Sequence, residues 1–156
     1  MATTTSQIRT VVGALYDLLV ARPLITADIV KVFKYAPSPR AAEATEYIVL
    51  AVKVDGAQRF EHASNRIKHD AYTLRGEIFV QKNGAGDVPA DDAHARAEVL
   101  LAEIESILQP NPTLGQGHTT VAELTAYEHV YGGDDSHRNH LVRFSVDVSQ
   151  RYVSTS

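Results

Sequence analysis

Apolar and polar residues alternate strictly over the C-terminal part of the chain. From position 142 every second residue is apolar, namely Val142, Phe144, Val146 and Val148. The residues between and after them are polar or charged, namely Arg143, Ser145, Asp147, Ser149 and Arg151. A period of two predicts a β-strand with one face buried and the other exposed to water or to a partner. We expect this strand to run from about Arg138 to Val153.

Four other segments are rich in β-branched and aromatic residues, which favours strands. They lie at about Asp28–Tyr35, Tyr47–Val54, Arg66–Gln81 and Thr119–Tyr131. Asp55-Gly56 predicts a turn, after which Arg59-Phe60 would begin a returning strand. Gly76 interrupts a strand and predicts a β-bulge there. Gly132–Ser136 predicts the loop of a final hairpin.

Two segments have the three- and four-residue spacing of amphipathic helices. The first is expected over about Ser6–Ala21, where Arg22-Pro23 ends it. The second is expected over about Asp91–Gln109, with acidic residues at its start and prolines after its end. The order of elements predicts an α+β fold, with a mainly antiparallel β-sheet and both helices packed on one face. With 156 residues, we expect one domain over positions 1–156.

Composition removes several function classes. The formal net charge of -4 argues against nucleic-acid binding as the main role, because neutralising phosphates requires concentrated Lys and Arg. The chain has no cysteine, which excludes disulfides, thiolate zinc sites and cysteine nucleophiles. Residues 1–7 lack the basic start and apolar centre of a signal peptide. No apolar run approaches the ~20 residues that a membrane-spanning helix needs.

Candidate chemistry is sparse. Seven histidines are scattered along the sequence, and His137 and His140 follow Asp134-Asp135 in a loop that could gather imidazoles and carboxylates. Their spacing does not match a metalloprotease motif and favours an ordinary polar hairpin loop. Gly84-Ala-Gly86 lacks the other residues of a dinucleotide or phosphate loop. We assign no catalytic, cofactor-binding or metal-binding residue and do not expect an enzyme.

Charged residues on strands and loops instead predict a protein interface. The second predicted helix is acidic, whereas the middle and last strands are basic, so neighbouring copies could pair these surfaces head to tail. The polar segment Asp55–Asn65 is expected to be either a hairpin tip that becomes ordered on a partner or a loop without a role. The candidate interface residues are Arg59, Phe60, His62, Arg66, Arg138, Arg143, Asp147 and Arg151.

The layout of the whole chain resembles the tail terminator (tail completion and head–tail joining) proteins of long-tailed bacteriophages. The resemblance rests on the first helix, the long strand Thr73–Gln81, and the helix with Ala93-x-Ala-x-Ala97 and Leu100–Leu108. It continues through Asn111–Gly115 to the closing strand Arg143–Arg151 and covers about Ser6–Tyr152. It involves no catalytic residue.

The resemblance implies a ring, expected as a hexamer, on the head-proximal end of the tail tube. Such a ring ends tube polymerisation and presents a surface to the head connector. The implied partners are further copies of this chain, the tail tube protein and the connector, while DNA passes through the lumen without specific binding. The implied location is the virion, after synthesis in the host cytoplasm.

Three alternatives remain open at the level of sequence. The nearest is another neck or connector-joining protein, or a tail tube subunit. A second is a small α+β enzyme or binding domain that uses the loop of His137 and His140. A third is a cellular adaptor domain. We also expect exposed sheet edges near Asp28–Tyr35 or Arg138–Val153 to pair with neighbouring subunits.

Overall fold

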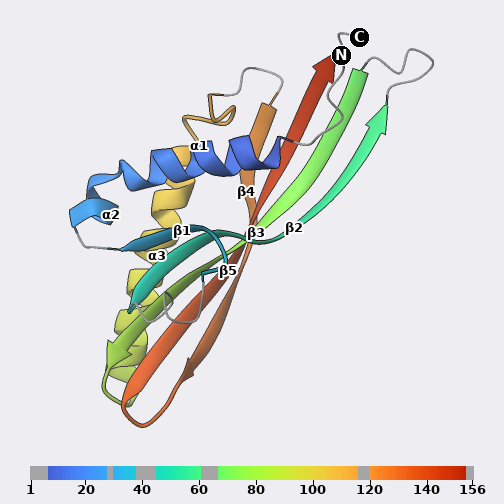
Figure 1. The fold of residues 1–156 in the computed structure, drawn as a ribbon. Helices are drawn as coiled ribbons and strands as arrows, with labels where there is room; N and C mark the ends of the chain where they lie inside the picture. Colours follow the sequence, from blue (N-terminus) through green and yellow to red (C-terminus); the bar gives the residue numbers. More distant parts are fainter. Residues whose placement is uncertain (1–6, 28–29, 38–44, 61–66, 116–119, 154–156) are drawn as a thin grey trace.

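A computed structural model describes residues 7–27, 30–37, 45–60, 67–115 and 120–153, with three helices and five strands (Figure 1). The side chains of 57–60, 67–68 and 152–153 are not described. The helices are α1 (Ile8–Val20), α2 (Pro23–Ala27) and α3 (Asp87–Leu108). The strands are β1 (Lys31–Tyr35), β2 (Glu46–Phe60), β3 (Ile67–Asn83), β4 (Thr120–Gly133) and β5 (His137–Val153).

The five strands form one sheet in the order β1-β2-β3-β5-β4. Only β1 and β2 are parallel, and the other neighbouring pairs are antiparallel. α3 connects β3 to β4, so the final hairpin returns to the sheet and β5 pairs with β3 along its whole length. The predicted α+β class and mainly antiparallel sheet are therefore confirmed.

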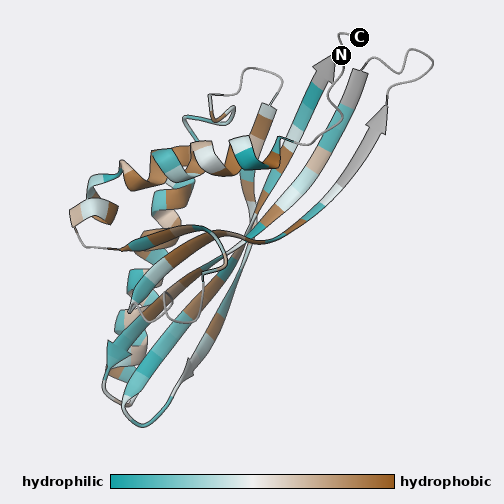
Figure 2. Cartoon of the chain, in the orientation of Figure 1, coloured by the Kyte–Doolittle hydropathy of each residue, from teal (hydrophilic) through white to brown (hydrophobic). Residues whose placement is uncertain are grey.

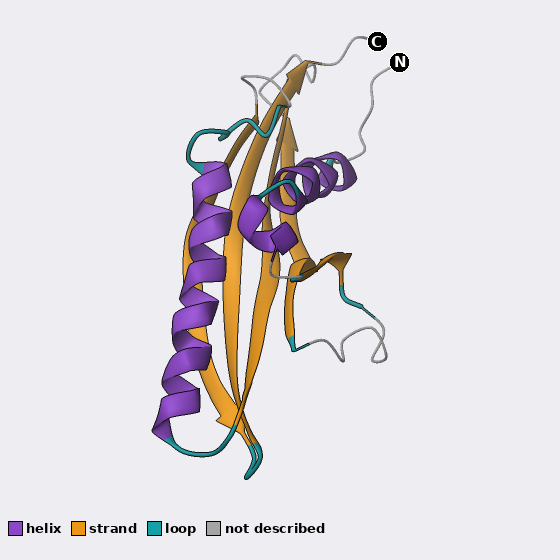
Figure 3. Cartoon of the chain, turned by 90° about the vertical axis from the view of Figure 1, so that its left-hand side faces the viewer, coloured by secondary structure: helices purple, strands orange, loops and turns teal. Residues whose placement is uncertain are grey.

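The helices form a layer on one face of the sheet. α3 lies along the length of the strands, whereas α1 crosses them (Figures 1 and 3). Each helix turns an apolar stripe toward the sheet, and apolar segments meet between the two layers (Figure 2). The α1 stripe is Val11, Val12, Leu15 and Leu19, and the α3 stripe is Ala93, Ala97, Leu100, Leu101, Ile104, Ile107 and Leu108. No helix in the described part of the chain is long and apolar enough to cross a membrane.

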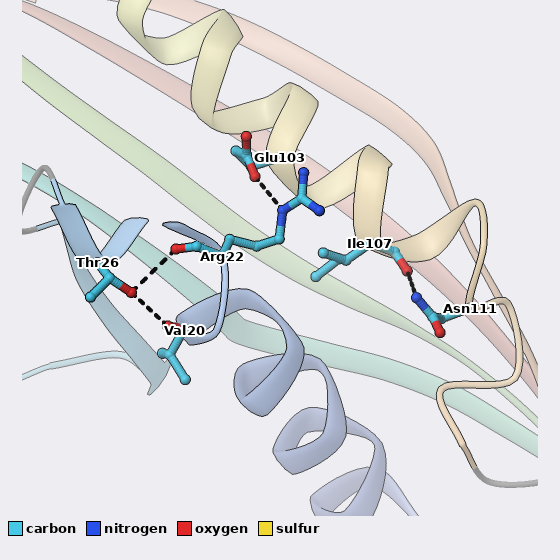
Figure 4. Close-up of polar contacts among 6 residues, drawn as sticks. All are labelled: Val20, Arg22, Thr26, Glu103, Ile107 and Asn111. Atoms are coloured by element: carbon cyan, nitrogen blue, oxygen red, sulfur yellow. Dashed lines mark hydrogen bonds and ion pairs between the residues drawn. The ribbon is translucent and has the colours of Figure 1, made fainter. Parts of the chain in front are cut away.

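The corner after α1 differs from the prediction. Pro23 does not only end the first helix but also begins α2, because the first helical position needs no backbone N–H. The Thr26 hydroxyl donates a hydrogen bond shared between two backbone carbonyls, that of Val20 at 3.0 Å and that of Arg22 at 3.2 Å (Figure 4). The Arg22 guanidinium lies 2.6 Å from the Glu103 carboxylate and so links this corner to α3.

The start of α3 also differs from the prediction, whereas its end agrees with it. The helix begins at Asp87, four residues before the predicted start, so Pro89 lies within its first turn, where proline is tolerated. Past its last residue, the Asn111 side chain donates a 2.9 Å hydrogen bond to the Ile107 carbonyl (Figure 4). This bond satisfies a carbonyl group that the end of a helix leaves without an intrahelical partner.

The predicted turn at Asp55-Gly56 is wrong. β2 runs straight through both residues, with Asp55 opposite Thr73 and Gly56 opposite Tyr72. A side chain at Gly56 would meet the Tyr72 Cβ at 3.1 Å, so glycine serves close packing there and not a turn. The first part of the predicted Asp55–Asn65 loop is therefore strand, and residues 61–65 lie outside the described ranges.

The predicted irregularity at Gly76 is present, but the additional residues lie in β2 and not in β3, because Val49 pairs with Glu77 and Lys53 with Arg75. β3 stays in register with β5 through Gly76, and the irregularity lies in the neighbouring strand β2, between Val49 and Lys53. A Cβ atom at Gly76 would lie 2.2 Å from Phe144 Cζ and 2.6 Å from the Val49 carbonyl oxygen. Glycine is required here because the aromatic ring of the opposite strand occupies the space.

One of the two expected sheet edges is confirmed. Among the described strands, β1 is one edge of the sheet, but β5 lies between β3 and β4 and has no free edge. The second edge is β4. The sequence could not distinguish β4 from β5, because both alternate and only pairing decides which is central.

Candidate functional site

The face of the sheet opposite the helices carries most of the exposed charge on the strands. Three of the predicted interface residues lie on it, because Arg143, Asp147 and Arg151 occupy alternate exposed positions of β5, whereas Val142, Phe144, Val146 and Val148 point toward the helices. We call this surface the open face. Its other charged residues include Lys31, Lys53, Asp55, Arg75, Glu77, Glu123 and Glu128.

Charges of opposite sign alternate across the open face. Arg143 lies in register between Glu77 of β3 and Glu128 of β4. The Asp147 carboxylate accepts a 2.7 Å hydrogen bond from the Thr73 hydroxyl. The Arg75 guanidinium lies 2.6 Å from Asp55, and this hydrogen bond lowers the pKa of the Asp55 carboxyl. Such exposed pairs contribute little to stability, but they hold the charged groups in a fixed arrangement that a partner surface of complementary charge can recognise.

Two hollows lie on the open face. The first, of about 340 Å³, has Lys53, Arg75, Glu77 and Arg143 in its lining. The second, of about 460 Å³, has Asp55, Thr73, Glu123 and Asp147 in its lining. Both combine polar side chains with exposed valines, Val52 in the first and Val121 in the second.

The remaining predicted interface residues are dispersed. Arg138 lies at the opposite end of β5 from Arg151, next to the β4–β5 turn. Arg59 and Phe60 belong to β2, where their backbones pair with His69 and Lys68. His62 and Arg66 lie outside the described residues. The structure therefore brings together Arg143, Asp147 and Arg151 on one face, but not the eight residues as one site.

The β4–β5 turn contains only part of the alternative set of imidazoles and carboxylates, because His137 Nδ1 lies 3.5 Å from the Asp134 carboxylate but His140 lies elsewhere. His140 belongs to strand β5, is 0% exposed and faces the helices. Asp134 instead accepts hydrogen bonds from the backbone N–H groups of Ser136 and His137, which lower the pKa of its carboxyl and close the hairpin turn. His137 and His140 are three positions apart on β5 and therefore point to opposite sides of the strand.

His140 takes part in a different cluster, which the sequence did not predict. One ring nitrogen from each of His94, His129 and His140 lies within 4.8 Å of the others. The three residues come from α3, β4 and β5 respectively. His129 Nδ1 lies 2.7 Å from His140 Nε2, and the His94 ring is stacked on that of His129.

A bulge in β4 makes this cluster possible. Before it, Thr120, Ala122 and Leu124 face the helices, and the register with β5 shifts between Leu124 and Ala126. The additional residue changes the phase of the strand, so His129 and Tyr131 oppose the inward-facing Val142 and His140. Without this shift, His129 would lie on the open face.

The cluster is polar and partly exposed at His94 and His129, whereas His140 is buried. The His94 Nε2 atom lies 2.6 Å from the exposed Glu98 carboxylate, and its Nδ1 atom lies 3.0 Å from the Tyr131 hydroxyl. Burial, together with the neighbouring His94 and His129 rings, lowers the pKa of His140 to about 4. His140 is therefore neutral at pH 7. Its Nδ1 atom is buried and has no hydrogen-bond partner among the described residues.

Comparison with known proteins shows a similarity of fold. No family model and no curated protein matches the sequence. Among solved structures, the chain is similar to a chain of a structure titled "Virion of native gene transfer agent (GTA) particle". The two have a TM-score of 0.58 and 16% sequence identity, and the match covers 88% of this chain and 93% of the other. At this identity the match shows a common fold that extends over nearly the whole of both chains.

Proposed function

We propose that this chain is a structural protein of a phage-like particle. The observation that carries the proposal is the nearly end-to-end fold similarity to a chain of a gene transfer agent virion. Fold similarity alone does not establish function, so the proposal also depends on the surface described above.

Within such a particle, we propose that the chain forms a ring, as a hexamer, that caps the head-proximal end of the tail tube. A tube grows because each added layer exposes the same binding surface again. A protein that ends growth must match this surface on one side and differ from it on the other. The two faces of this sheet are unequal, since helices cover one and the charged open face is the other. Such asymmetric subunits suit the head-to-tail contacts of a closed ring.

The two sheet edges also support head-to-tail contacts. β1 is a strand of 5 residues and β4 one of 14, so the two edges of the sheet are different surfaces. Unequal edges favour a contact in which one edge of each subunit meets the other edge of the next. We propose that the tube protein or an adjacent subunit docks on the open face around Arg143 and Asp147. DNA would pass through the ring lumen without being held, consistent with the net charge of -4.

The same fold similarity also suits a neck protein or a tail tube subunit, and assembly in solution separates these functions. We expect the purified chain, measured by light scattering and negative-stain microscopy over a range of concentrations, to form closed rings that never lengthen. Their mass should be a fixed multiple of 17.0 kDa. Open tubes whose length increases with concentration would contradict the capping function and identify a tube subunit.

A further inference from the structure

Three imidazoles from three different elements are a set of ligands that transition-metal ions prefer. His94, His129 and His140 hold ring nitrogens within 4.8 Å of one another. In a tetrahedral zinc site with Zn–N bonds of about 2.0–2.1 Å, ligand nitrogens lie roughly 3.3 Å apart. The distance from His129 Nδ1 to His140 Nε2 is 2.7 Å, which is shorter than this separation, and the largest separation within the cluster is at most 4.8 Å, which is longer. Small side-chain rotations would therefore bring the three nitrogens to the spacing that an ion needs.

The hydrogen-bond network prepares His94 to act as a ligand. The Glu98 carboxylate only accepts, so the His94 Nε2 atom, 2.6 Å away, carries the hydrogen and donates it. The lone pair is therefore on Nδ1, the atom that the Tyr131 hydroxyl approaches to 3.0 Å. A carboxylate that orients a histidine through its second nitrogen is the usual arrangement around bound metals.

The buried ring of His140 provides an independent indication. It is 0% exposed, and its Nδ1 atom has no hydrogen-bond partner among the described residues. A buried polar atom without a partner is uncommon in folded proteins and requires an explanation. The nitrogen that faces His129 is Nε2, so an ion would bind there and not at Nδ1. Leucine or phenylalanine would serve packing alone without the cost of burying Nδ1, which favours a use for the imidazole.

We propose that His94, His129 and His140 bind one divalent transition-metal ion of the zinc type. Three protein ligands leave a fourth position for water, and the half-buried rings of His94 and His129 give access from solvent. The ion would fasten the N-terminal half of α3 to the β4–β5 hairpin. This part of α3 otherwise contacts the sheet through the small buried side chains of Ala93 and Ala97 and through the ion pair of Arg96 with Glu46 of β2, so an ion there would add a link to β4 and β5.

The test uses the whole chain, which is first treated with a chelator and then separated from the chelator. Zn²⁺ alone is titrated by calorimetry, and the melting temperature is followed in parallel. We expect one saturable site and a melting temperature that rises with the concentration of Zn²⁺. His94→Gln and His129→Gln should weaken binding at least about 100-fold, and Glu98→Gln about 10-fold.

His69→Gln is the matched control, because His69 lies on β3, outside the cluster. It removes one imidazole and should leave both affinity and stoichiometry unchanged. Glu98 is exposed on the surface of α3, so its substitution remains informative should a histidine variant fold poorly. The proposal is overturned if Zn²⁺ shows no saturable site, or if the cluster variants and His69→Gln bind it equally.

Discussion

Replacing Gly76 by alanine is expected to lower the free energy of unfolding by about 3 kcal/mol and Tm by roughly 6–12 °C. The added Cβ atom would lie 2.2 Å from Phe144 Cζ and 2.6 Å from the Val49 carbonyl oxygen. Moving either group would cost free energy, because Phe144 is 1% exposed within the core and the Val49 carbonyl is part of the backbone of β2. Thermal and urea unfolding, followed by circular dichroism, measure the loss.

Gly132→Ala is the matched control. Gly132 also lies in a strand, but no atom lies within 4 Å of the position that its Cβ would take. This variant should be as stable as the original chain. Phe144→Leu should restore part of the stability when combined with Gly76→Ala, because it removes the nearer of the two clashes. Equal stability of Gly76→Ala and Gly132→Ala would contradict the packing described for this pair of strands.

Reversing the charge of Arg143 is expected to reduce assembly at least tenfold while leaving the fold intact. The Arg143→Glu change places a third carboxylate between Glu77 and Glu128 on the open face. Like charges at an exposed position cost the monomer about 0.2–1 kcal/mol. A partner surface that complements Arg143 would be negatively charged. In the complex it would lie against the new glutamate, and such a contact between like charges costs several kcal/mol.

The expected result is a Tm within a few degrees of the original chain and a loss of rings or of binding to tail tubes. Arg9→Glu makes the same change in charge at an exposed site in the first turn of α1, on the helix side of the molecule. Its assembly should be unaffected. Normal assembly of Arg143→Glu, by mass and by tube binding, would show that this part of the open face contacts no partner.

The alternation of residues predicts much of the fold because burial on one face of a strand leaves a direct signature in sequence. The inward set of Val142, Phe144, Val146 and Val148 follows from it, as do the exposed positions of Arg143, Asp147 and Arg151. The same holds for α1 and α3, whose apolar stripes have helical spacing. Whether the exposed residues form an interface is not contained in this signature and stays a prediction.

The mistakes arise where a neighbouring strand overrides a local signal. Asp55-Gly56 is a typical turn sequence, but β3 pairs with both residues and keeps β2 extended. Gly76 indicates a bulge in its own strand, but the additional residues lie in β2, and the ring of Phe144, 68 positions later, is what requires glycine. In both cases the local conformation depends on a contact with a residue distant in sequence.

The histidine cluster shows the same limit for a candidate site. His94, His129 and His140 have no recognisable spacing, because their proximity depends on the bulge after Leu124 and on the register between β4 and β5. A single additional residue in one strand decides whether His129 faces the helices or the open face. Sequence patterns rarely reveal such a residue, so the cluster could be found only in the folded structure.

The most direct test of the capping function is to add the labelled chain to preformed tubes of the cognate tail tube protein and to locate it by electron microscopy. We expect label at one end of each tube only, and tubes that no longer lengthen when fresh tube subunits are supplied. Label along the whole length of the tubes, or tubes that carry no label and continue to grow, would contradict the proposal.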